Sequence, residues 1–157
     1  MPSDPSPSPH VLIRPAKASD HEALIRLWRG AVEATHHFLT ADDVDFYERQ
    51  VASYLPQMSD LRVAEEAGRG VVGFVALEDA VVEMLFVDPE VHGRGVGTRL
   101  LEDAARGLDV VEVDVNEQNP SARAFYRARG FEERGRSEHD AEGRPFPLLH
   151  LRRGARP

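Results

Sequence analysis

Three glycines at alternate positions, Gly93, Gly95 and Gly97, lie between an apolar run and a helical pattern. Glycine adopts positive φ without steric cost and lets backbone N–H groups approach a ligand closely. Where such a loop leads into a helix, the free N–H groups and the positive end of the helix dipole form an anion site. The loop therefore predicts a binding site for a phosphate group.

Two common phosphate-binding motifs do not fit this loop. A P-loop requires Lys followed by Ser or Thr after its last glycine, but Thr98 and Arg99 follow Gly97. The dinucleotide fingerprint GxGxxG would place its third glycine at position 98, which is Thr98. The motif that remains is HGRGVG at residues 92–97.

This motif, with LFVDP at residues 85–89 before it, resembles the Q/RxxGxG/A signature of the GCN5-related N-acetyltransferases (GNAT). That loop holds the pyrophosphate of coenzyme A, and His92 stands where the signature has Gln or Arg. The resemblance implies that acetyl-CoA is the cosubstrate. Its expected contacts in this part of the chain are Leu85, Phe86, Val87, His92, Gly93, Arg94, Gly95, Val96, Gly97 and Thr98.

A second segment, NEQNPSARAFYRARGF at residues 116–131, resembles the other cofactor-binding segment of the same family. By position, Asn119 would bond the pantetheine arm and Tyr126 would lie beside the sulfur, while Phe125 packs the helix on the sheet. The alternative is that Phe125 and Tyr126 are core residues and Asn119 is only a helix cap.

Three further segments resemble the bacterial YjaB-type N-acetyltransferases: THHFL at 35–39, NEQN at 116–119 and GRSEHDAEGRPFPLLHL at 135–151. This resemblance covers about residues 11–152 and implies transfer of the acetyl group directly to a primary amine, a peptidyl lysine. Dimers are common among such relatives, so a homodimer is an open expectation. Two other functions remain open: a small-molecule amine acetyltransferase and a non-catalytic acyl-CoA binding module.

Glu83 is the candidate general base, because it interrupts the apolar strand pattern of residues 81–87 just before the loop. A lysine amine with a pKa of about 10.4 needs such a base near neutral pH. The alternative is an outward, solvated carboxylate. A backbone N–H near residues 85–87 would bind the oxyanion.

Tyr126 is the candidate acid. A phenol (pKa about 10) is less acidic than a thiol (about 8.5), so we expect it to stabilise the thiolate mainly by hydrogen bonding.

The acceptor site is expected where the first helix ends, at His36, His37 and Phe38, together with Glu83. The two histidines would position the substrate or serve as an alternative base. A structural explanation competes with this one, because a histidine charge is favourable at a helix C-terminus.

Composition excludes several classes of function. The chain has 157 residues, no cysteine and a net charge of −8. Without cysteine there are no disulfides or thiolate metal sites, and no HExxH pattern occurs, so we expect no metal. The acidic charge argues against nucleic-acid or anionic-membrane binding and suits a cationic amine. No signal peptide or membrane-spanning run is seen, and we expect a cytoplasmic protein.

Periodicity and capping signals predict the elements that position these residues. We expect a single domain at residues 11–153, with a disordered tail at 1–10 and a frayed tail at 154–157. Ser19 and Glu22 predict a capping box for the first helix, and Thr40 a cap for the second. The helix after the glycine loop should bury Val96, Leu100, Leu101, Ala104, Ala105 and Leu108.

The predicted order is βααβββαβαββ, an α+β fold in which one mixed, mostly antiparallel sheet is flanked by helices, as in the GNAT fold.

Overall fold

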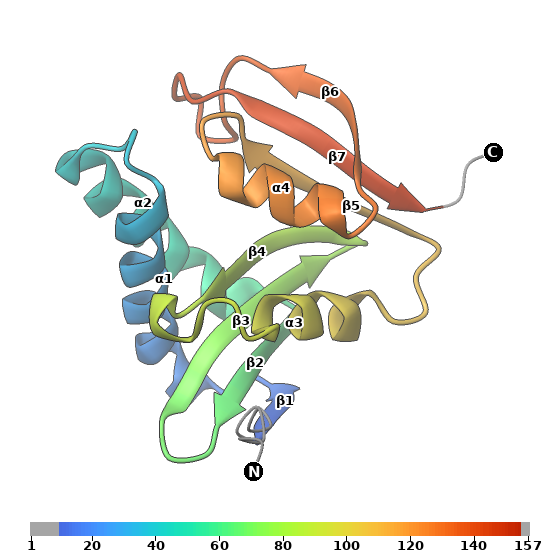
Figure 1. Ribbon diagram of the computed structural model, residues 1–157. Coiled ribbons are helices and arrows are strands. Elements are labelled where there is room, and N and C mark those ends of the chain that lie inside the picture. Colours follow the sequence, from blue (N-terminus) through green and yellow to red (C-terminus); the bar gives the residue numbers. More distant parts are fainter. Residues whose placement is uncertain (1–9, 155–157) are drawn as a thin grey trace, which may run out of the picture.

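The computed structural model describes residues 10–154 and contains the predicted order of strands and helices (Figure 1). The elements are β1 (Val11–Pro15), α1 (His21–Thr35), α2 (Ala41–Tyr54), β2 (Asp60–Glu66), β3 (Gly70–Glu78), β4 (Val81–Val87), α3 (Val96–Ala105), β5 (Val110–Asn116), α4 (Pro120–Ala128), β6 (Glu132–Ser137) and β7 (Leu148–Gly154). Short 3₁₀ turns lie at Ala18–Asp20, Leu55–Gln57 and Pro89–Val91. Of the tails predicted at residues 1–10 and 154–157, residues 1–9 and 155–157 lie outside the described residues.

All strands form one sheet in the order β1-β2-β3-β4-β5-β7-β6. Only the β4–β5 pair is parallel, so the sheet is mixed and mostly antiparallel, as predicted. The last strand, β7, lies between β5 and β6.

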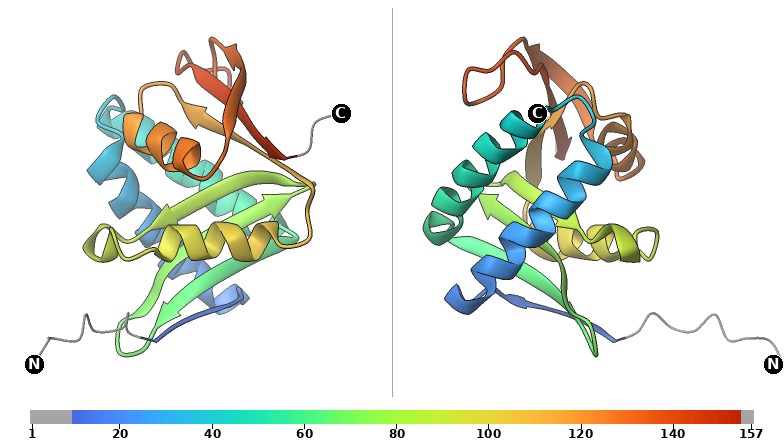
Figure 2. Two further views of the ribbon diagram at one scale, coloured as in Figure 1. Left: turned by 45° about the vertical axis from the view of Figure 1, so that its right-hand side comes forward. Right: turned by 90° about the vertical axis from the view of Figure 1, so that its left-hand side faces the viewer.

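Helices cover both faces of the sheet. Figure 2 shows α1 and α2 on one side and α3 and α4 on the other. On the first side, Leu24 and Trp28 of α1 and Val51 of α2 are buried against Phe74 of β3. On the second side, the buried residues of α3 and α4 pack on inward-facing side chains of β3, β5 and β7. The predicted face of α3 is buried from Val96 to Ala105.

The parallel pair β4–β5 is the irregular part of the sheet. Its register contains only two pairs, Val81 with Glu112 and Val82 with Val113. Beyond Val82 the two strands are not paired, although each remains paired with its other neighbour. A gap therefore opens in the centre of the sheet, beside the start of α4.

Several boundaries differ from the predictions. Ser19 does not cap α1, because the turn starts earlier: the N–H of Lys17 donates to the Asp20 carboxylate (2.7 Å), which also binds Arg14. Leu108 is 39% exposed, because α3 ends at Ala105 and Gly107 turns the chain with φ +84°. Gly154, assigned to a frayed tail, is the last residue of β7 and is paired with Val110 of β5.

His10, assigned to the disordered tail, accepts a hydrogen bond at its carbonyl from the N–H of Ala67 (3.2 Å). None of the helices in residues 10–154 is long and apolar enough to cross a membrane.

Candidate active site

The gap between β4 and β5 contains a cavity of about 130 Å³, hereafter the smaller cavity. Its walls come from both strands, from Asn119, Ala122 and Tyr126 on one side of α4, and from His36 at the end of α1. The separation of the two strands thus brings residues from four elements around one space.

Glu83 is directed to this space by a β-bulge in β4. Ala76 pairs with Met84 and Leu77 with Val82, so Glu83 is an extra residue on its strand. Met84 packs on the α1 side of the sheet, whereas Val82 and Leu85 pack on the α3 side. The Glu83 side chain lines the smaller cavity and also a larger one.

The electrostatic surroundings of Glu83 favour its neutral form. Although Glu83 is the exposed residue of β4, the partial burial of its carboxyl, together with the nearby charges of Glu78 and Asp114, raises the pKa of that carboxyl above its ordinary value. No hydrogen bond or ion pair joins this carboxyl to another of residues 10–154. It is therefore a carboxylate of raised basicity that is available to a ligand.

Backbone N–H groups of β4 also face the gap. The N–H of Asp88 donates to the carbonyl of Val72 in β3 (2.8 Å). Because N–H directions alternate along an antiparallel strand, the N–H groups of Val87 and Leu85 point away from β3, toward the side where β5 is no longer paired. By the same alternation the Phe86 N–H is directed to β3, so Phe86 shapes the cavity walls but offers no free donor there.

Tyr126 is buried, with its side chain between two other rings. Phe125 and Phe131 lie 5.0 and 5.2 Å from it in edge-to-face contacts. Burial raises the pKa of the Tyr126 phenol, which keeps it protonated. Its hydroxyl makes no hydrogen bond within the described residues, so this donor is available to a molecule in the smaller cavity.

The glycine loop has the conformation that its sequence predicts. Gly93 and Gly95 have φ of +85° and +81°, and Gly95 is the N-cap of α3 without any side-chain cap. The first N–H groups of α3 are therefore free to bind an anion. His92 is exposed beside them, and Arg94 lies 3.7 Å from the carboxylate of Glu66.

Gly73 in β3 explains how α3 comes so close to the sheet. A Cβ at this position would lie 3.0 Å from Leu100 Cδ1, 3.2 Å from the Phe86 carbonyl and 3.3 Å from Val96 Cγ1. Sequence reasoning did not select Gly73, because nothing local distinguishes it from other strand glycines.

Helix α4, within the second predicted cofactor segment, packs against the glycine loop and the start of α3. Asn119 caps α4 by accepting the N–H of Ala122 (3.2 Å), and its Nδ2 faces His36 Nε2 at 3.5 Å. The ring of Phe125 lies 3.4 Å from where a Cβ of Gly97 would be, so it packs over the first turn of α3. The Thr98 hydroxyl accepts a hydrogen bond from Arg129 Nε (2.8 Å), so its own O–H and its backbone N–H remain as donors.

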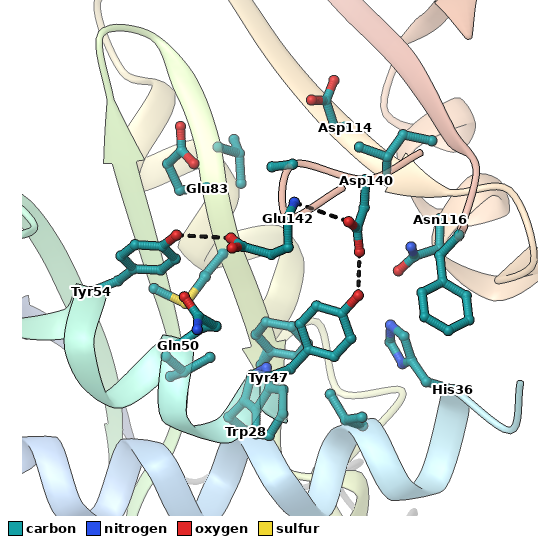
Figure 3. A pocket seen from close by; sticks show the side chains of 18 of the residues that line it. Trp28, His36, Tyr47, Gln50, Tyr54, Glu83, Asp114, Asn116, Asp140 and Glu142 are labelled. Carbon is teal, nitrogen blue, oxygen red and sulfur yellow. Dashed lines mark hydrogen bonds between the residues drawn. The ribbon is translucent and has the colours of Figure 1, made fainter. Parts of the chain in front are cut away.

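A larger cavity of about 300 Å³ adjoins the smaller one, and the two share Glu83, His36 and Asn116 among their lining residues. Aromatic side chains of α1 and α2, including Trp28, Tyr47 and Tyr54, form one wall. Figure 3 shows four carboxylates around this space, those of Glu83, Asp114, Asp140 and Glu142. Its lining residues include no Lys or Arg.

The segment between β6 and β7, residues 138–147, forms another wall of the larger cavity. Tyr47 donates a hydrogen bond to Asp140, and Tyr54 donates to Glu142 (2.8 Å). Asp140 also accepts the backbone N–H groups of Glu142 and Arg144. These carboxylates and tyrosines were not predicted as site residues, although Tyr47 and Tyr54 recur seven residues apart on one side of a predicted helix.

The predicted acceptor residues separate into two groups. His36 and Glu83 line both cavities, whereas His37 and Phe38 line neither. Phe38 instead packs between His36 and Phe146, with ring centroids 5.4 and 5.7 Å away. Burial, with a contribution from His37, lowers the pKa of His36 to about 4. This lowered pKa disfavours the alternative in which a charged His36 stabilises the end of the helix.

Comparison with known proteins agrees with these motifs. Residues 58–133 match the model of the acetyltransferase (GNAT) domain. The chain is 40% identical over 141 residues to the peptidyl-lysine N-acetyltransferase YjaB of Escherichia coli strain K12. This alignment covers 90% of this chain and 95% of that protein. The solution structure of apo-form YjaB from Escherichia coli superposes with a TM-score of 0.85 over 93% of this chain and 99% of the other.

A PaiA N-acetyltransferase from Thermoplasma acidophilum, solved in complex with coenzyme A, has the same fold. It is 18% identical, with a TM-score of 0.74 over 93% of this chain and 99% of that one.

Proposed function

The chain belongs to the GNAT family of N-acetyltransferases, and from this premise we propose that it transfers the acetyl group of acetyl-CoA directly to the side-chain amine of a peptidyl lysine. The observation that carries the proposal is the gap between β4 and β5. It opens a cavity lined by Glu83 on one side and Tyr126 on the other, with free N–H groups of β4 between the two strands.

Acetyl-CoA fits the residues around this gap. The free N–H groups at the start of α3 would bind its pyrophosphate, and the positive-φ glycines let the loop approach closely. The pantetheine arm would then pass between the loop and α4, which is in contact with α3 through Phe125 and Gly97. Its thioester would lie in the smaller cavity.

The residues of the smaller cavity have different roles in the proposed reaction. The lysine ammonium first loses one proton to solvent, and Glu83, directly or through water, takes a second proton from the neutral amine as the amine nitrogen bonds to the thioester carbonyl carbon. The N–H of Leu85 or Val87 stabilises the oxygen that gains negative charge. When the carbon–sulfur bond breaks, the Tyr126 hydroxyl donates a hydrogen bond to the departing thiolate, which takes up a proton after release. With its raised pKa, Tyr126 acts as a hydrogen-bond donor rather than as a proton donor.

The larger cavity supports a cationic acceptor. Its four carboxylates attract a lysine ammonium, and its aromatic wall accommodates the aliphatic part of the side chain. YjaB is named a peptidyl-lysine N-acetyltransferase, and the present chain shares 40% of its aligned residues with that protein.

The test is acetyl transfer to a peptide that has a blocked N-terminus and one internal lysine. We expect the peptide to gain the mass of one acetyl group, and the same peptide with Lys replaced by Arg to remain unmodified. Spermidine and free lysine serve as small-molecule acceptors in parallel. Acetylation of these alone would redirect the proposal to small amines.

Calorimetric titration with acetyl-CoA, using coenzyme A and ATP as controls, tests the proposed binding of acetyl-CoA separately from the transfer reaction. Failure to bind acetyl-CoA would contradict the proposal as a whole.

A further inference from the structure

His36 is placed at the junction of the two cavities. It is the first residue after α1, and its ring lines both the larger and the smaller cavity. Figure 3 shows the imidazole projecting from the end of α1 toward Asn116, on the same side as Tyr47. Among residues 10–154, it is the only histidine that lines either cavity.

Hydrogen bonds define which ring nitrogen of His36 carries the proton. The Thr35 hydroxyl donates its single hydrogen to the carbonyl of Ala31 (2.8 Å). The same oxygen lies 2.7 Å from His36 Nδ1, so it must accept the hydrogen of Nδ1. The proton is therefore on Nδ1, and Nε2 carries a lone pair.

The opposite side of the ring agrees with this assignment. Asn119 Oδ1 accepts the N–H of Ala122 and the hydroxyl of Ser121, each at 3.2 Å, which turns its Nδ2 toward His36. Nδ2 is a donor, so it faces the Nε2 lone pair, but at 3.5 Å the contact is long. Nε2 is thus a hydrogen-bond acceptor that is only weakly satisfied.

We propose that His36 Nε2 accepts a hydrogen bond from the acceptor amine, and that Thr35 is the positioning residue that fixes His36 in the form able to do so. This inference rests on the proposed function. A neutral primary amine has two N–H bonds and one lone pair. His36 Nε2 accepts a hydrogen bond from one of these N–H groups, on the side of the larger cavity opposite Glu83 (Figure 3), and the amine lone pair is directed at the thioester carbon. The low pKa of His36 supports this role, because the ring remains an acceptor throughout the neutral range.

The test compares four variants. His36→Asn keeps an amide donor near Thr35 but removes the acceptor at the Nε2 position. Thr35→Val removes the hydroxyl, whereas Thr35→Ser keeps it. His37→Asn is the matched control, because His37 lines neither cavity. For each variant, kcat and KM for the lysine peptide are measured, and the acetyl-CoA dissociation constant is determined by calorimetry.

We expect His36→Asn to lower kcat/KM for the peptide by about tenfold to a hundredfold, the effect of one lost hydrogen bond in the reacting complex. Thr35→Val should lower it in the same direction, Thr35→Ser should restore it, and His37→Asn should leave it unchanged. The acetyl-CoA dissociation constant should stay within about twofold of that of the unmodified protein. Unchanged kcat/KM in His36→Asn, or equal loss in the two Thr35 variants, would overturn the proposal.

A second measurement does not depend on activity. Nitrogen-15 NMR of the imidazole rings distinguishes a protonated Nδ1 from a protonated Nε2. We expect His36 to show protonated Nδ1 in the unmodified protein and to lose this preference in Thr35→Val. A protonated Nε2 in the unmodified protein would overturn the proposal even if the enzyme is active. If no amine is acetylated, the proposed function fails, while the NMR result still decides the state of His36.

Discussion

At the scale of single residues, the pKa values of Glu83 and Tyr126 are both raised, but with different consequences for the proposed reaction. The pKa of Glu83 is raised by partial burial and by neighbouring carboxylates, so it becomes a stronger base. The pKa of Tyr126 is raised by burial alone, which makes it a weaker acid. Both changes favour a neutral side chain, but only Glu83 must ionise to take part in the proposed reaction.

Replacing Glu83 by Gln should lower kcat about a hundredfold to ten-thousandfold, because the amine loses its general base. The unmodified enzyme needs the ionised carboxylate, so its kcat should rise with pH through a midpoint above the ordinary value of 4.5 for Glu. Glu83→Gln should lose this acidic limb. The measurement is a pH profile of kcat with the lysine peptide.

Glu112→Gln is the control for Glu83, because Glu112 lies on the adjacent strand β5 and lines neither cavity. An acidic limb that persists in Glu83→Gln would assign the base to another residue.

Replacing Tyr126 by Phe should lower kcat by about tenfold to a hundredfold, since one hydrogen bond to the thiolate is lost. The acetyl-CoA dissociation constant should change less. Because the hydroxyl has no hydrogen-bond partner among residues 10–154, the free energy of unfolding should change by no more than about 1 kcal/mol. Steady-state kinetics and thermal unfolding check both statements, and unchanged kcat would remove Tyr126 from the mechanism.

At the scale of elements, the site depends on how closely α3 packs on the sheet. Gly73 and the first turns of α3 are in contact through Val96 and Leu100. This contact places the free N–H groups of the helix start beside the end of β4. The glycine loop supplies the conformation of the anion site, and Gly73 supplies its position.

Replacing Gly73 by Ala should destabilise the protein by about 1–3 kcal/mol, because the added methyl group overlaps Leu100 and the Phe86 backbone. The displaced helix start should also weaken acetyl-CoA binding. Chemical unfolding and calorimetry measure the two effects.

Gly30→Ala is the matched control for Gly73. Gly30 lies in α1 with nothing within 4 Å of the added Cβ, so this change should stabilise the protein by up to about 1 kcal/mol. Equal stability of the two variants would contradict the packing argument.

At the scale of the whole molecule, charge is distributed so that the larger cavity is acidic. The chain has a net charge of −8, and four carboxylates line this cavity. Asp114 is bonded to His150 (2.6 Å) and Asp140 to Tyr47, whereas Glu83 has no such partner among the described residues. Under the proposed function, this charge would attract a cationic acceptor to the cavity, where Glu83 is the carboxylate without a partner in residues 10–154.

Raising the ionic strength from about 0.02 to 0.2 M should lower kcat/KM for the lysine peptide by roughly threefold to tenfold, because salt screens this attraction. Glu142→Gln should reduce the salt dependence, since Glu142 lines the cavity. Glu132→Gln, a change of an exposed residue in β6 outside it, should not. A salt dependence that is the same in all three proteins would argue against electrostatic attraction of the acceptor by the cavity.

The sequence by itself determined the order of the elements, the conformation of the glycine loop and the caps at Thr40 and Asn119. These features depend on residues a few positions apart, so periodicity, capping and positive φ express them locally. The same local rules misplaced the start of α1, because the Asp20 carboxylate accepts the N–H of Lys17 and also binds Arg14, six positions earlier in β1.

Only the tertiary structure decided which side chains meet in the site. The bulge that directs Glu83 to the cavities depends on its register with β3. Tyr47 meets Asp140 across 93 positions in the sequence, and Tyr54 meets Glu142 across 88. The low pKa of His36 follows from its burial where the end of α1 meets Asn119 at the start of α4. Contacts between such distant residues arise from packing of the whole sheet and its helices, which no short stretch of sequence specifies.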